Sequence, residues 1–349
     1  MKIIEVNNYQ ELLSLKNEWA NLLEKCDHTV FSTWEWLSTW WKHFGNNKRL
    51  VLLLAMENDK IVGIAPLMYS TRKICGLPTG KITFIGTPHT DYTDFITEKA
   101  EKCICLFIDY LKRHLKNWNY IELTEIPENS KSIPILTSLS KFMKLSTPCP
   151  YKPLTKSRET LWDTLSKAMR NNLKRYVKKT ERDFTIEFVD YSDVQSCSEG
   201  MRLLFNLHQK RWSLKGCPGA FANAKFRNFN LEIARIFARK NYLGLFILKL
   251  SGQPVAAIYG FKYQKKFYQY LSGFDPDYSR YSIGNQLILY TMEKCIEEGL
   301  FEFDFMRGGE AHKYFWTAFS RWNRTTIIPR NSLWTTLYWI YTKIGKQSN

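Results

Sequence analysis

The stretch that decides the fold is Phe267–Thr317, FYQYLSGFDPDYSRYSIGNQLILYTMEKCIEEGLFEFDFMRGGEAHKYFWT. It begins as a strand, and a polar turn separates this strand from the helical pattern of Gly284–Glu298. The apolar run Phe301–Arg307 then predicts a buried strand that ends in a polar loop. A strand, a helix and a strand in this order predict an α/β unit.

The residues before this stretch form a hairpin that has a counterpart in the first half of the chain. Residues 246–263, FILKLSGQPVAAIYGFKY, parallel residues 52–69, LLLAMENDKIVGIAPLMY. Each hairpin has a four-residue polar turn and a returning strand rich in small apolar residues. Val62 and Val255 occupy like places, 193 residues apart. The repeat indicates two copies of one α/β unit.

Periodicity predicts the other elements of both halves. We expect helices at 8–25, 31–44, 101–115, 194–211 and 225–240, and strands at 50–56, 61–69, 81–85, 92–96, 120–125, 243–250 and 255–263. The expected domains are an N-terminal domain at 1–150, a basic linker helix at 151–185, a C-terminal domain at 186–330 and a tail at 331–349.

The charge balance points to an anionic partner. The 349 residues include 50 Lys and Arg against 33 Asp and Glu, a formal net charge of +17. Such an excess is typical of proteins that bind a phosphorylated cofactor, nucleic acid or an anionic membrane face. Residues 166–184, SKAMRNNLKRYVKKTERDF, form an amphipathic helix with one basic face, which is either a solvated face or a landing surface for tRNA or acidic lipid. DNA is not an expected partner.

Several classes of protein are excluded by the sequence. The N-terminal residues lack the apolar run of a signal peptide, and no apolar run approaches the roughly 20 residues that span a bilayer. Eight cysteines are scattered without a CxxC spacing, and six histidines show no paired spacing. We therefore expect a cytoplasmic protein with no metal and no disulfide framework. The aromatic stripe at 330–346 either docks on the protein itself or lies at the inner membrane face.

Two polar loops and one helix start hold the candidate site residues. Gly284 opens a helix whose free N–H groups suit a phosphate, and Arg280 supplies a countercharge. The loop after the last buried strand contains Arg307, Glu310 and Lys313, where open α/β sheets place ligands. In the first half, the loop His89–Phe95 packs two carboxylates, an imidazole and a phenol between two strands. These groups suit the binding of an amine or a sugar hydroxyl, although an Asx turn also explains the two aspartates.

These segments together resemble the acyl-CoA-binding half of GNAT acyltransferases, in particular the CelD/BcsL-like branch, whose members look like tandem GNAT folds akin to the FemABX aminoacyl transferases. The resemblance covers roughly Phe31 to Trp316. It rests on LSGFDPDYSRYSIGNQL (271–287), EGLFEFDFMRGGEAHKYFW (298–316), HTDYTDF (89–95), GCPGAFANAKFRNF (216–229) and the hairpin ending in PVAA (254–257). The implied fold is α/β (α+β), a tandem GNAT-like fold with two mixed sheets flanked by helices.

The resemblance implies acyl-CoA, for example acetyl-CoA, as the donor. The implied donor-binding residues are Arg280, Tyr281, Ser282, Gly284 and Asn285, with Ser272 and Gly273 on the strand that polarises the acyl carbonyl. One departure stands out. The family loop reads Gln/Arg-x-x-Gly-x-Gly/Ala, whereas Tyr281 and Gln286 occupy its first and last positions. The bulk of Gln286 predicts crowding where a pyrophosphate approaches the backbone.

The implied reaction is direct transfer of the acyl group to an amine, or less readily a hydroxyl, of a small molecule or a cell-envelope glycan precursor. Glu310 or Asp304 is expected to accept the amine proton and Tyr314 to return one to the leaving group. Lys313, in a Lys-x-x-aromatic element, is expected to lie against the donor. The expected acceptor-binding residues are Arg307, His89, Asp91, Tyr92, Asp94 and Tyr270.

Two alternatives remain open at this stage. An aminoacyl-tRNA-dependent transferase of the FemABX type would explain the net charge, the basic helix and the altered loop together. A non-catalytic module that binds a polyanion or a membrane surface on a GNAT scaffold would explain the charge without any chemistry.

Overall fold

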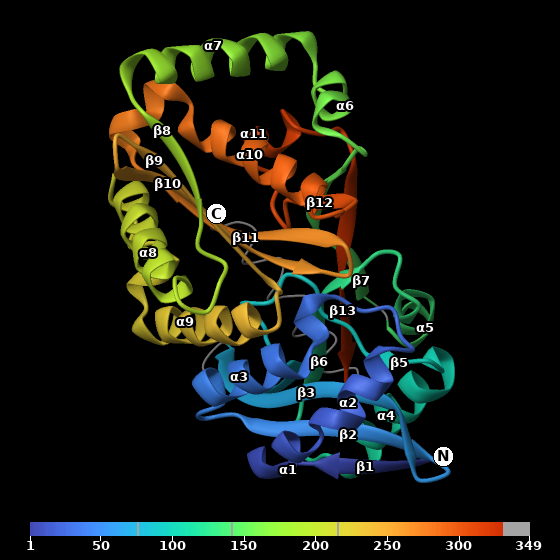
Figure 1. Ribbon diagram of the computed structural model, residues 1–349. Coiled ribbons are helices and arrows are strands. Elements are labelled where there is room, and N and C mark those ends of the chain that lie inside the picture. The colour runs from blue at the N-terminus through green and yellow to red at the C-terminus, as the bar shows by residue number, and fades with distance from the viewer. Residues whose placement is uncertain (75–76, 141, 215, 331–349) are drawn as a thin grey trace. The chain divides into compact units, whose positions relative to one another are not determined.

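The computed structural model describes residues 1–74, 77–140, 142–214 and 216–330. Its contacts divide the chain into two compact units (Figure 1). Unit 1 holds Met1–Thr147 and the chain from Trp322 onward, and unit 2 holds Pro148–Arg321. The chain leaves unit 1 within strand β7 (Phe142–Pro153) and returns within strand β13 (Ser320–Pro329). The predicted domain limits, with a separate linker, stay predictions, and the predicted tail lies outside the described residues.

Unit 1 is a mixed sheet with helices on it. The strand order is β1-β2-β3-β4-β6-β13, antiparallel throughout except for the parallel pair β4 and β6. The elements are β1 (Lys2–Val6), α1 (Tyr9–Ser14), α2 (Lys16–Leu23), α3 (Trp34–Phe44), β2 (Arg49–Glu57), β3 (Lys60–Ile74), β4 (Leu77–Phe84), β5 (Ile96–Thr97), α4 (Ala100–His114), β6 (Tyr120–Pro127) and α5 (Ser132–Leu139).

Unit 2 repeats this plan. Its strand order is β8-β9-β10-β11-β12-β7, and β11 and β12 are the parallel pair. The elements are α6 (Arg158–Asp163), α7 (Lys167–Asp183), β8 (Ile186–Asp190), α8 (Cys197–Ser213), α9 (Ala224–Arg239), β9 (Leu243–Leu250), β10 (Gln253–Tyr263), β11 (Lys266–Phe274), η3 (Pro276–Tyr281), α10 (Ile283–Glu297), β12 (Glu302–Asp304) and α11 (Ala311–Tyr314).

The two units share one topology, as the repeated hairpin predicted. In each unit an edge strand and two or more helices precede three antiparallel strands, and a 15-residue helix, α4 or α10, then leads to a parallel strand. The hairpin β2–β3 of unit 1 corresponds to β9–β10 of unit 2. The predicted α/β class with two mixed sheets flanked by helices is thereby confirmed.

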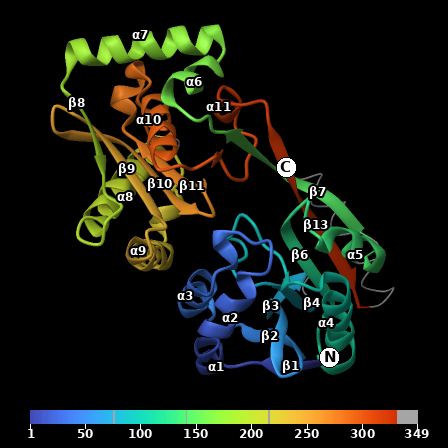
Figure 2. The same cartoon turned by 45° about the vertical axis from the view of Figure 1, so that its right-hand side comes forward.

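Alternate residues of the unit 2 strands face different helices. Phe246, on β9, joins Leu287 and Met292 of α10 in one apolar core. The neighbouring residue Leu245 lies against α8, because a Cβ added to Gly200 of α8 would come within 2.7 Å of it. Since successive strand residues point to opposite faces, α8 and α10 cover opposite faces of this sheet. Helix α7 packs beside α10 (Figures 1 and 2).

Two predicted strands are wrong in extent. Residues 92–96 were expected to form a strand, but only Ile96–Thr97 pair, with β3. The residues before them are held instead by single bonds to β6, such as Thr93 N–H to the Glu125 carbonyl at 2.9 Å. The strand expected at 301–307 is limited to Glu302–Asp304. Its shortness shapes the site below.

Three observations on the described residues bear on function. Among the helices that the structure describes, none is both long and apolar enough to cross a membrane. In the same part of the chain, no three His, Cys, Asp or Glu side chains gather as ligands of a metal ion. The described cysteines are free thiols.

Candidate functional site

In unit 2 the strands β11 and β12 separate early. They pair only from Lys266 with Glu302 to Tyr268 with Asp304, where β12 ends. Strand β11 continues to Phe274 and keeps its other edge on β10. It also carries a bulge, because Tyr259 pairs with Leu271 and Gly260 with Gln269, which leaves Tyr270 as the extra residue. The second half of β11 therefore has a free edge beside the end of β12.

A cleft of about 270 Å³ opens along the second half of β11. Its walls combine this strand with three residues of β10, one of η3, the start of α10, one residue of α8 and one of α11. The lining residues are Arg211, Ala256, Ala257, Ile258, Gln269, Ser272, Gly273, Phe274, Ser279, Ser282, Ile283, Gly284, Asn285, Leu287, Ile288 and His312. Five residues that the sequence assigned to the donor are thus brought together here: Ser272, Gly273, Ser282, Gly284 and Asn285.

The start of α10 is open toward this cleft. Ser282, just before the helix, has a left-handed backbone (φ 53°) and makes no capping hydrogen bond with its side chain. Its Oγ instead accepts a hydrogen bond from Asn285 Nδ2 at 3.0 Å. A Cβ added at Gly284 would meet nothing within 4 Å. The first turn of α10 therefore presents backbone N–H groups and unfilled space, which suits a bound anion.

Gln286 does not crowd this space, contrary to the expectation from the sequence. Its side chain is buried, and its Nε2 donates hydrogen bonds to Thr180 Oγ1 on α7 and to the Tyr281 carbonyl, both at 2.8 Å. The large residue at the last position of the loop motif thus fastens α10 to α7 and leaves the cleft open.

Tyr281 and Arg280 also turn toward α7. Tyr281 is buried, and its hydroxyl donates to Asp183 Oδ2 at 2.9 Å. Arg280 donates to the same hydroxyl at 2.9 Å and stacks over the Tyr281 ring at 4.9 Å. Neither residue is among the described residues that line the cleft. Their predicted part in donor binding is therefore not carried into the proposal below.

Arg211, which the sequence analysis did not single out, lies in the cleft wall. It is in the last turn of α8, and its guanidinium stacks over the Phe274 ring at 4.9 Å. Its Nε is buried without a hydrogen-bond partner in the described structure. Burial lowers the pKa of Arg211, while the charge of Glu310 acts in the opposite direction. Basic residues are common near helix ends, so the position of Arg211 in the sequence did not indicate that it lines the cleft.

Lys313, on the short helix α11, binds the loop that connects β12 to α11. The side chain is buried, and its Nζ donates to three carbonyls, those of Met306 at 3.2 Å, Arg307 at 2.8 Å and Gly308 at 3.2 Å. It also forms an ion pair with Glu310 at 2.9 Å. All of its donors are used within the loop, so the geometry supports a structural role for Lys313.

The environment of Glu310 weakens it as a base. Burial raises the pKa of this carboxyl, but the hydrogen bond and charge of Lys313 outweigh burial and leave it below its usual value. Asp304 is fully buried, and its Oδ1 accepts from the backbone N–H of Met306 at 2.7 Å. Tyr314 is exposed on α11. His312, on α11, lines the cleft.

The remaining unit 2 candidates lie beside the cleft. Arg307 is half-buried, and its carbonyl is one of the three bound by Lys313. Tyr270, the bulged residue, packs its ring against Phe261 at 5.4 Å and Tyr259 at 6.0 Å. These residues therefore shape the strand and loop that form the cleft.

In unit 1 the loop that holds the other candidates is packed into its own core. His89 Nδ1 accepts from Trp40 Nε1 at 3.1 Å, and Tyr92 is buried near Phe31. The carbonyl of buried Asp91 accepts from Asn323 Nδ2 at 2.8 Å. The loop is thus held by contacts with α3 and with β13 of its own unit.

Asp94 has a complete set of local partners. It accepts hydrogen bonds from the Ser130 hydroxyl, from Ser132 Oγ at 2.5 Å and from the backbone N–H of Phe95 at 2.8 Å. Burial raises its pKa to about 6, against the lowering effect of these hydrogen bonds. Its contacts are those of a residue that fixes a loop, and the predicted role of this loop in acceptor binding stays a prediction.

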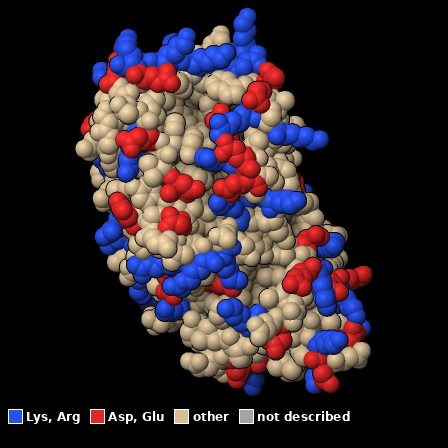
Figure 3. Space-filling model, viewed as in Figure 1, with Lys and Arg blue, Asp and Glu red and all other residues tan. Residues whose placement is uncertain are grey.

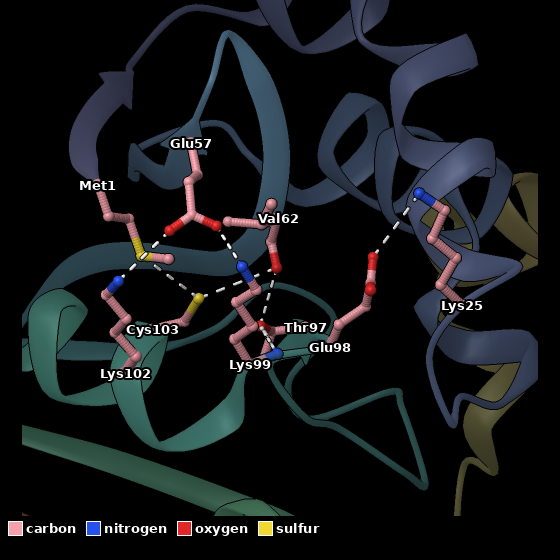
Figure 4. Close-up of polar contacts among 9 residues, drawn as sticks. All are labelled: Met1, Lys25, Glu57, Val62, Thr97, Glu98, Lys99, Lys102 and Cys103. Atoms are coloured by element: carbon pink, nitrogen blue, oxygen red, sulfur yellow. Dashed lines mark hydrogen bonds and ion pairs between the residues drawn. The ribbon is translucent and has the colours of Figure 1, made fainter.

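Unit 1 also has a shallow hollow at the start of α4. Figure 4 shows the polar contacts of Lys99 and Lys102, two of the residues that line it. Its polar rim is neutralised: Glu57 forms ion pairs with Lys99 and with Lys102, the latter at 3.3 Å. Cys103 is buried behind it, with its Sγ 3.9 Å from Met1 Sδ. The hollow lacks a free charge from these residues and does not resemble the cleft of unit 2.

Helix α7 confirms the predicted amphipathic basic helix. Ser166 caps it by accepting a hydrogen bond from the Met169 N–H, and Leu173 and Thr180 are buried on its inner side. Lys and Arg side chains run along its outer side (Figure 3). The exposed cations are Lys167, Lys174, Arg175, Lys178 and Arg182, of which only Arg182 forms an ion pair in the described structure, with Asp183.

Comparison with known proteins agrees with this geometry. Residues 167–314 match the family model of the acetyltransferase (GNAT) domain. The matched segment spans α7 to α11 and so includes every element that lines the cleft. Residues 167–314 are therefore a GNAT acetyltransferase domain, and this domain supports a transferase. No curated protein sequence matches the chain.

Solved structures extend the likeness to the fold of the whole chain. A structure of FemX superimposes with a TM-score of 0.66 at 12% identity, over 96% of this chain and 99% of that one. The structure of L-PGS from Bacillus licheniformis gives 0.56 at 12% identity, over 93% and 96%. A tandem GNAT protein from the clavulanic acid biosynthesis pathway gives 0.53 at 8%, over 95% and 99%. At such identities the likeness concerns the fold, and it confirms the predicted relation to tandem GNAT and FemABX-like proteins.

Proposed function

We propose that the protein transfers an acyl group from acyl-CoA, with acetyl-CoA as the simplest donor, to an amine of a small molecule or a cell-envelope glycan precursor. The observation that carries the proposal is the cleft of unit 2, where the free edge of β11 leads to the uncapped start of α10. The positive end of the helix dipole and its free N–H groups would bind the donor's diphosphate. The open space beside Gly284 leaves room for it.

The backbone of β11 would bind the rest of the donor, namely its pantetheine arm and its thioester carbonyl. Beyond Tyr268 its amide groups on the β12 side are not paired with β12, so they are available to the amides of the donor's pantetheine arm. N–H groups near Ser272 and Gly273 would polarise the thioester carbonyl and stabilise the negative charge that develops on its oxygen.

We assign the proton transfer to His312. It lines the cleft, and an imidazole has a basicity suited to neutral pH. Glu310 and Asp304 serve less well, because Lys313 lowers the pKa of Glu310 and so weakens it as a base, and Asp304 is fully buried. The acceptor amine attacks the thioester carbonyl and gives up a proton to His312. The C–S bond then breaks and the leaving sulfur takes this proton from His312, which leaves an amide and the CoA thiol.

Donor binding is tested by titration calorimetry with acetyl-CoA. Gly284→Glu places a negative charge at the start of α10, and Ala224→Glu places the same charge at the exposed start of α9. A carboxylate near a helix N-terminus favours the helix, so both variants should stay folded. We expect Gly284→Glu to weaken acetyl-CoA binding at least tenfold and Ala224→Glu to leave it unchanged. Equal binding by the wild type and Gly284→Glu would refute the assignment.

The reaction is tested by release of free CoA in the presence of a panel of amino sugars and amino acids. His312→Asn should reduce turnover by roughly 10²–10⁴-fold and remove the acid limb of the pH profile, with little change in the affinity for acetyl-CoA. A variant that turns over as fast as the wild type at neutral pH would exclude His312 as the base.

The second candidate is transfer from an aminoacyl-tRNA, which the basic face of α7 favours. Binding of aminoacyl-tRNA should then weaken steeply with salt, and Lys174→Glu with Lys178→Glu should flatten that dependence. If acetyl-CoA does not bind and charged tRNA does, this candidate replaces the first.

A further inference from the structure

The cleft contains a cation whose side chain forms no ion pair among the described residues. Among the described residues that line it, Arg211 is the one Lys or Arg. Its Nε is buried without a hydrogen-bond partner in the part of the chain that the structure describes. Glu310, the carboxylate whose charge acts on Arg211, is itself paired with Lys313 at 2.9 Å. Its neighbour on α8, Lys210, is in contrast neutralised by Asp275 at 2.6 Å and Asp277 at 3.1 Å.

Such an arrangement is unfavourable unless a ligand completes it. Arginine stays protonated at any physiological pH, and a half-buried guanidinium without an ion-pair partner bears a desolvation cost. The charge of Glu310 offsets this cost only in part, because burial still lowers the pKa of Arg211. The stack on Phe274 returns only part of that cost. An anion in the cleft would supply the missing hydrogen bonds and charge.

The loop before α10 does not provide this cation itself. Arg280 and Tyr281 are bonded to each other, and the Tyr281 hydroxyl is bonded to Asp183 of α7. The start of α10 therefore has N–H groups for a phosphate but no side-chain cation from its own loop. The guanidinium that shares its cleft comes from α8, about seventy positions earlier in the chain.

We propose that Arg211 binds the diphosphate of the donor together with the start of α10, and so replaces the cation that the loop lacks. The proposal rests on the proposed function. The planar guanidinium suits two parallel hydrogen bonds to phosphate oxygens. A second atom without a hydrogen-bond partner is consistent with the same ligand. The buried Oε1 of Gln269, also in the cleft wall, accepts no hydrogen bond from the described residues, and an amide N–H of the pantetheine arm would supply one.

The test compares three probes by titration calorimetry: acetyl-CoA, S-acetylpantetheine, which lacks the diphosphate, and inorganic pyrophosphate. The variants are Arg211→Gln, Arg211→Lys and, as a control for charge, Arg202→Gln at an exposed position of α8. We expect Arg211→Gln to weaken acetyl-CoA and pyrophosphate at least tenfold, to leave S-acetylpantetheine within twofold, and Arg211→Lys to recover part of the loss. Arg202→Gln should behave as the wild type.

Two results would overturn the assignment of Arg211. One is acetyl-CoA binding to Arg211→Gln with wild-type affinity; the other is an equal loss for acetyl-CoA and S-acetylpantetheine, which would place the effect away from the diphosphate. Failure of the proposed function looks different. The wild type would then bind neither thioester, and the dependence of pyrophosphate binding on Arg211 would decide the anion site by itself.

Discussion

Replacing Lys313 by methionine separates a structural from a catalytic role of this residue. Methionine keeps most of the length and apolar character of the side chain but removes the ammonium that binds the carbonyls of Met306, Arg307 and Gly308. Arg307 and Gly308 are partly exposed, so water can replace the lost bonds there. Met306 is buried at 1% exposure, and its carbonyl would lose its hydrogen-bond donor.

The magnitude follows from these contacts. One buried unsatisfied carbonyl costs about 1–3 kcal/mol, and the two remaining charge-assisted bonds are partly replaced by water, so we expect Lys313→Met to lower the stability of unit 2 by roughly 3 kcal/mol. For a unit of this size that corresponds to a fall of roughly 6–12 °C in its unfolding temperature. Turnover should fall as well, because the same loop positions His312.

The assay is thermal unfolding followed by circular dichroism, with urea denaturation as a second measure. Lys294→Met is the matched control, since Lys294 pairs with Glu297 on the exposed side of α10 and its loss should cost less than about 1 kcal/mol. If Lys313→Met unfolds within a degree of the wild type while turnover is lost, the structural account is wrong and Lys313 acts directly on the substrate.

Three further predictions concern packing and pH. Gly273→Ala should destabilise unit 2 by about 1–3 kcal/mol in urea denaturation, because a Cβ there would lie 2.4 Å from the backbone N of His208. Gly284→Ala should be neutral or stabilising in the same measurement, because a Cβ at Gly284 would meet nothing within 4 Å. Burial raises the pKa of Asp94 from 3.8 to about 6, so the folded state holds the proton more tightly than the unfolded state. The free energy of unfolding should therefore fall as pH rises through this range, and Asp94→Asn should abolish that fall. The same pH dependence in Asp94→Asn and the wild type would contradict this prediction. Burial and the charge of Arg211 lower the pKa of His208 from 6.5 to about 4. The contribution of His208 to the stability of the folded state is therefore present above pH 6.5 and is lost as pH drops toward 4. Unfolding measurements on His208→Gln should show no such loss of stability at acid pH.

The sequence predicted the elements whose signals are local. The hairpins at 52–69 and 246–263 have alternating or continuous apolar strands around short polar turns, and both form as expected. The basic helix was recognised because its cations recur at three- and four-residue spacing, and it begins at Lys167, directly after the first residue of the predicted segment. Strand β13 was not predicted, because its partner β6 lies about 200 residues away and only that pairing makes it a strand.

The candidate site divides in the same way. The helix start at Gly284 and the strand residues Ser272 and Gly273 could be located, because a strand, turn and helix are contiguous in sequence. Arg211 could not, since its place depends on how closely α8 approaches β11. The direction in which a side chain points cannot be predicted from residue spacing either. Nothing in the sequence near Tyr281 indicates that its hydroxyl is hydrogen-bonded to Asp183, nearly a hundred residues away.

The chain passes from unit 1 into unit 2 and then returns to unit 1, and this order affects how the units fold during synthesis on the ribosome. Unit 2 is one continuous segment, Pro148–Arg321, whereas unit 1 needs β13, whose Ile327 and Ile328 are buried against its sheet. The first unit to be translated is therefore the last that can be completed, and its half-finished sheet has to wait with the edge of β6 unpaired while some 170 further residues emerge. At roughly 5–20 residues per second this delay lasts on the order of ten to thirty seconds. During it the exposed strand edge is a target for chaperones and for mispairing.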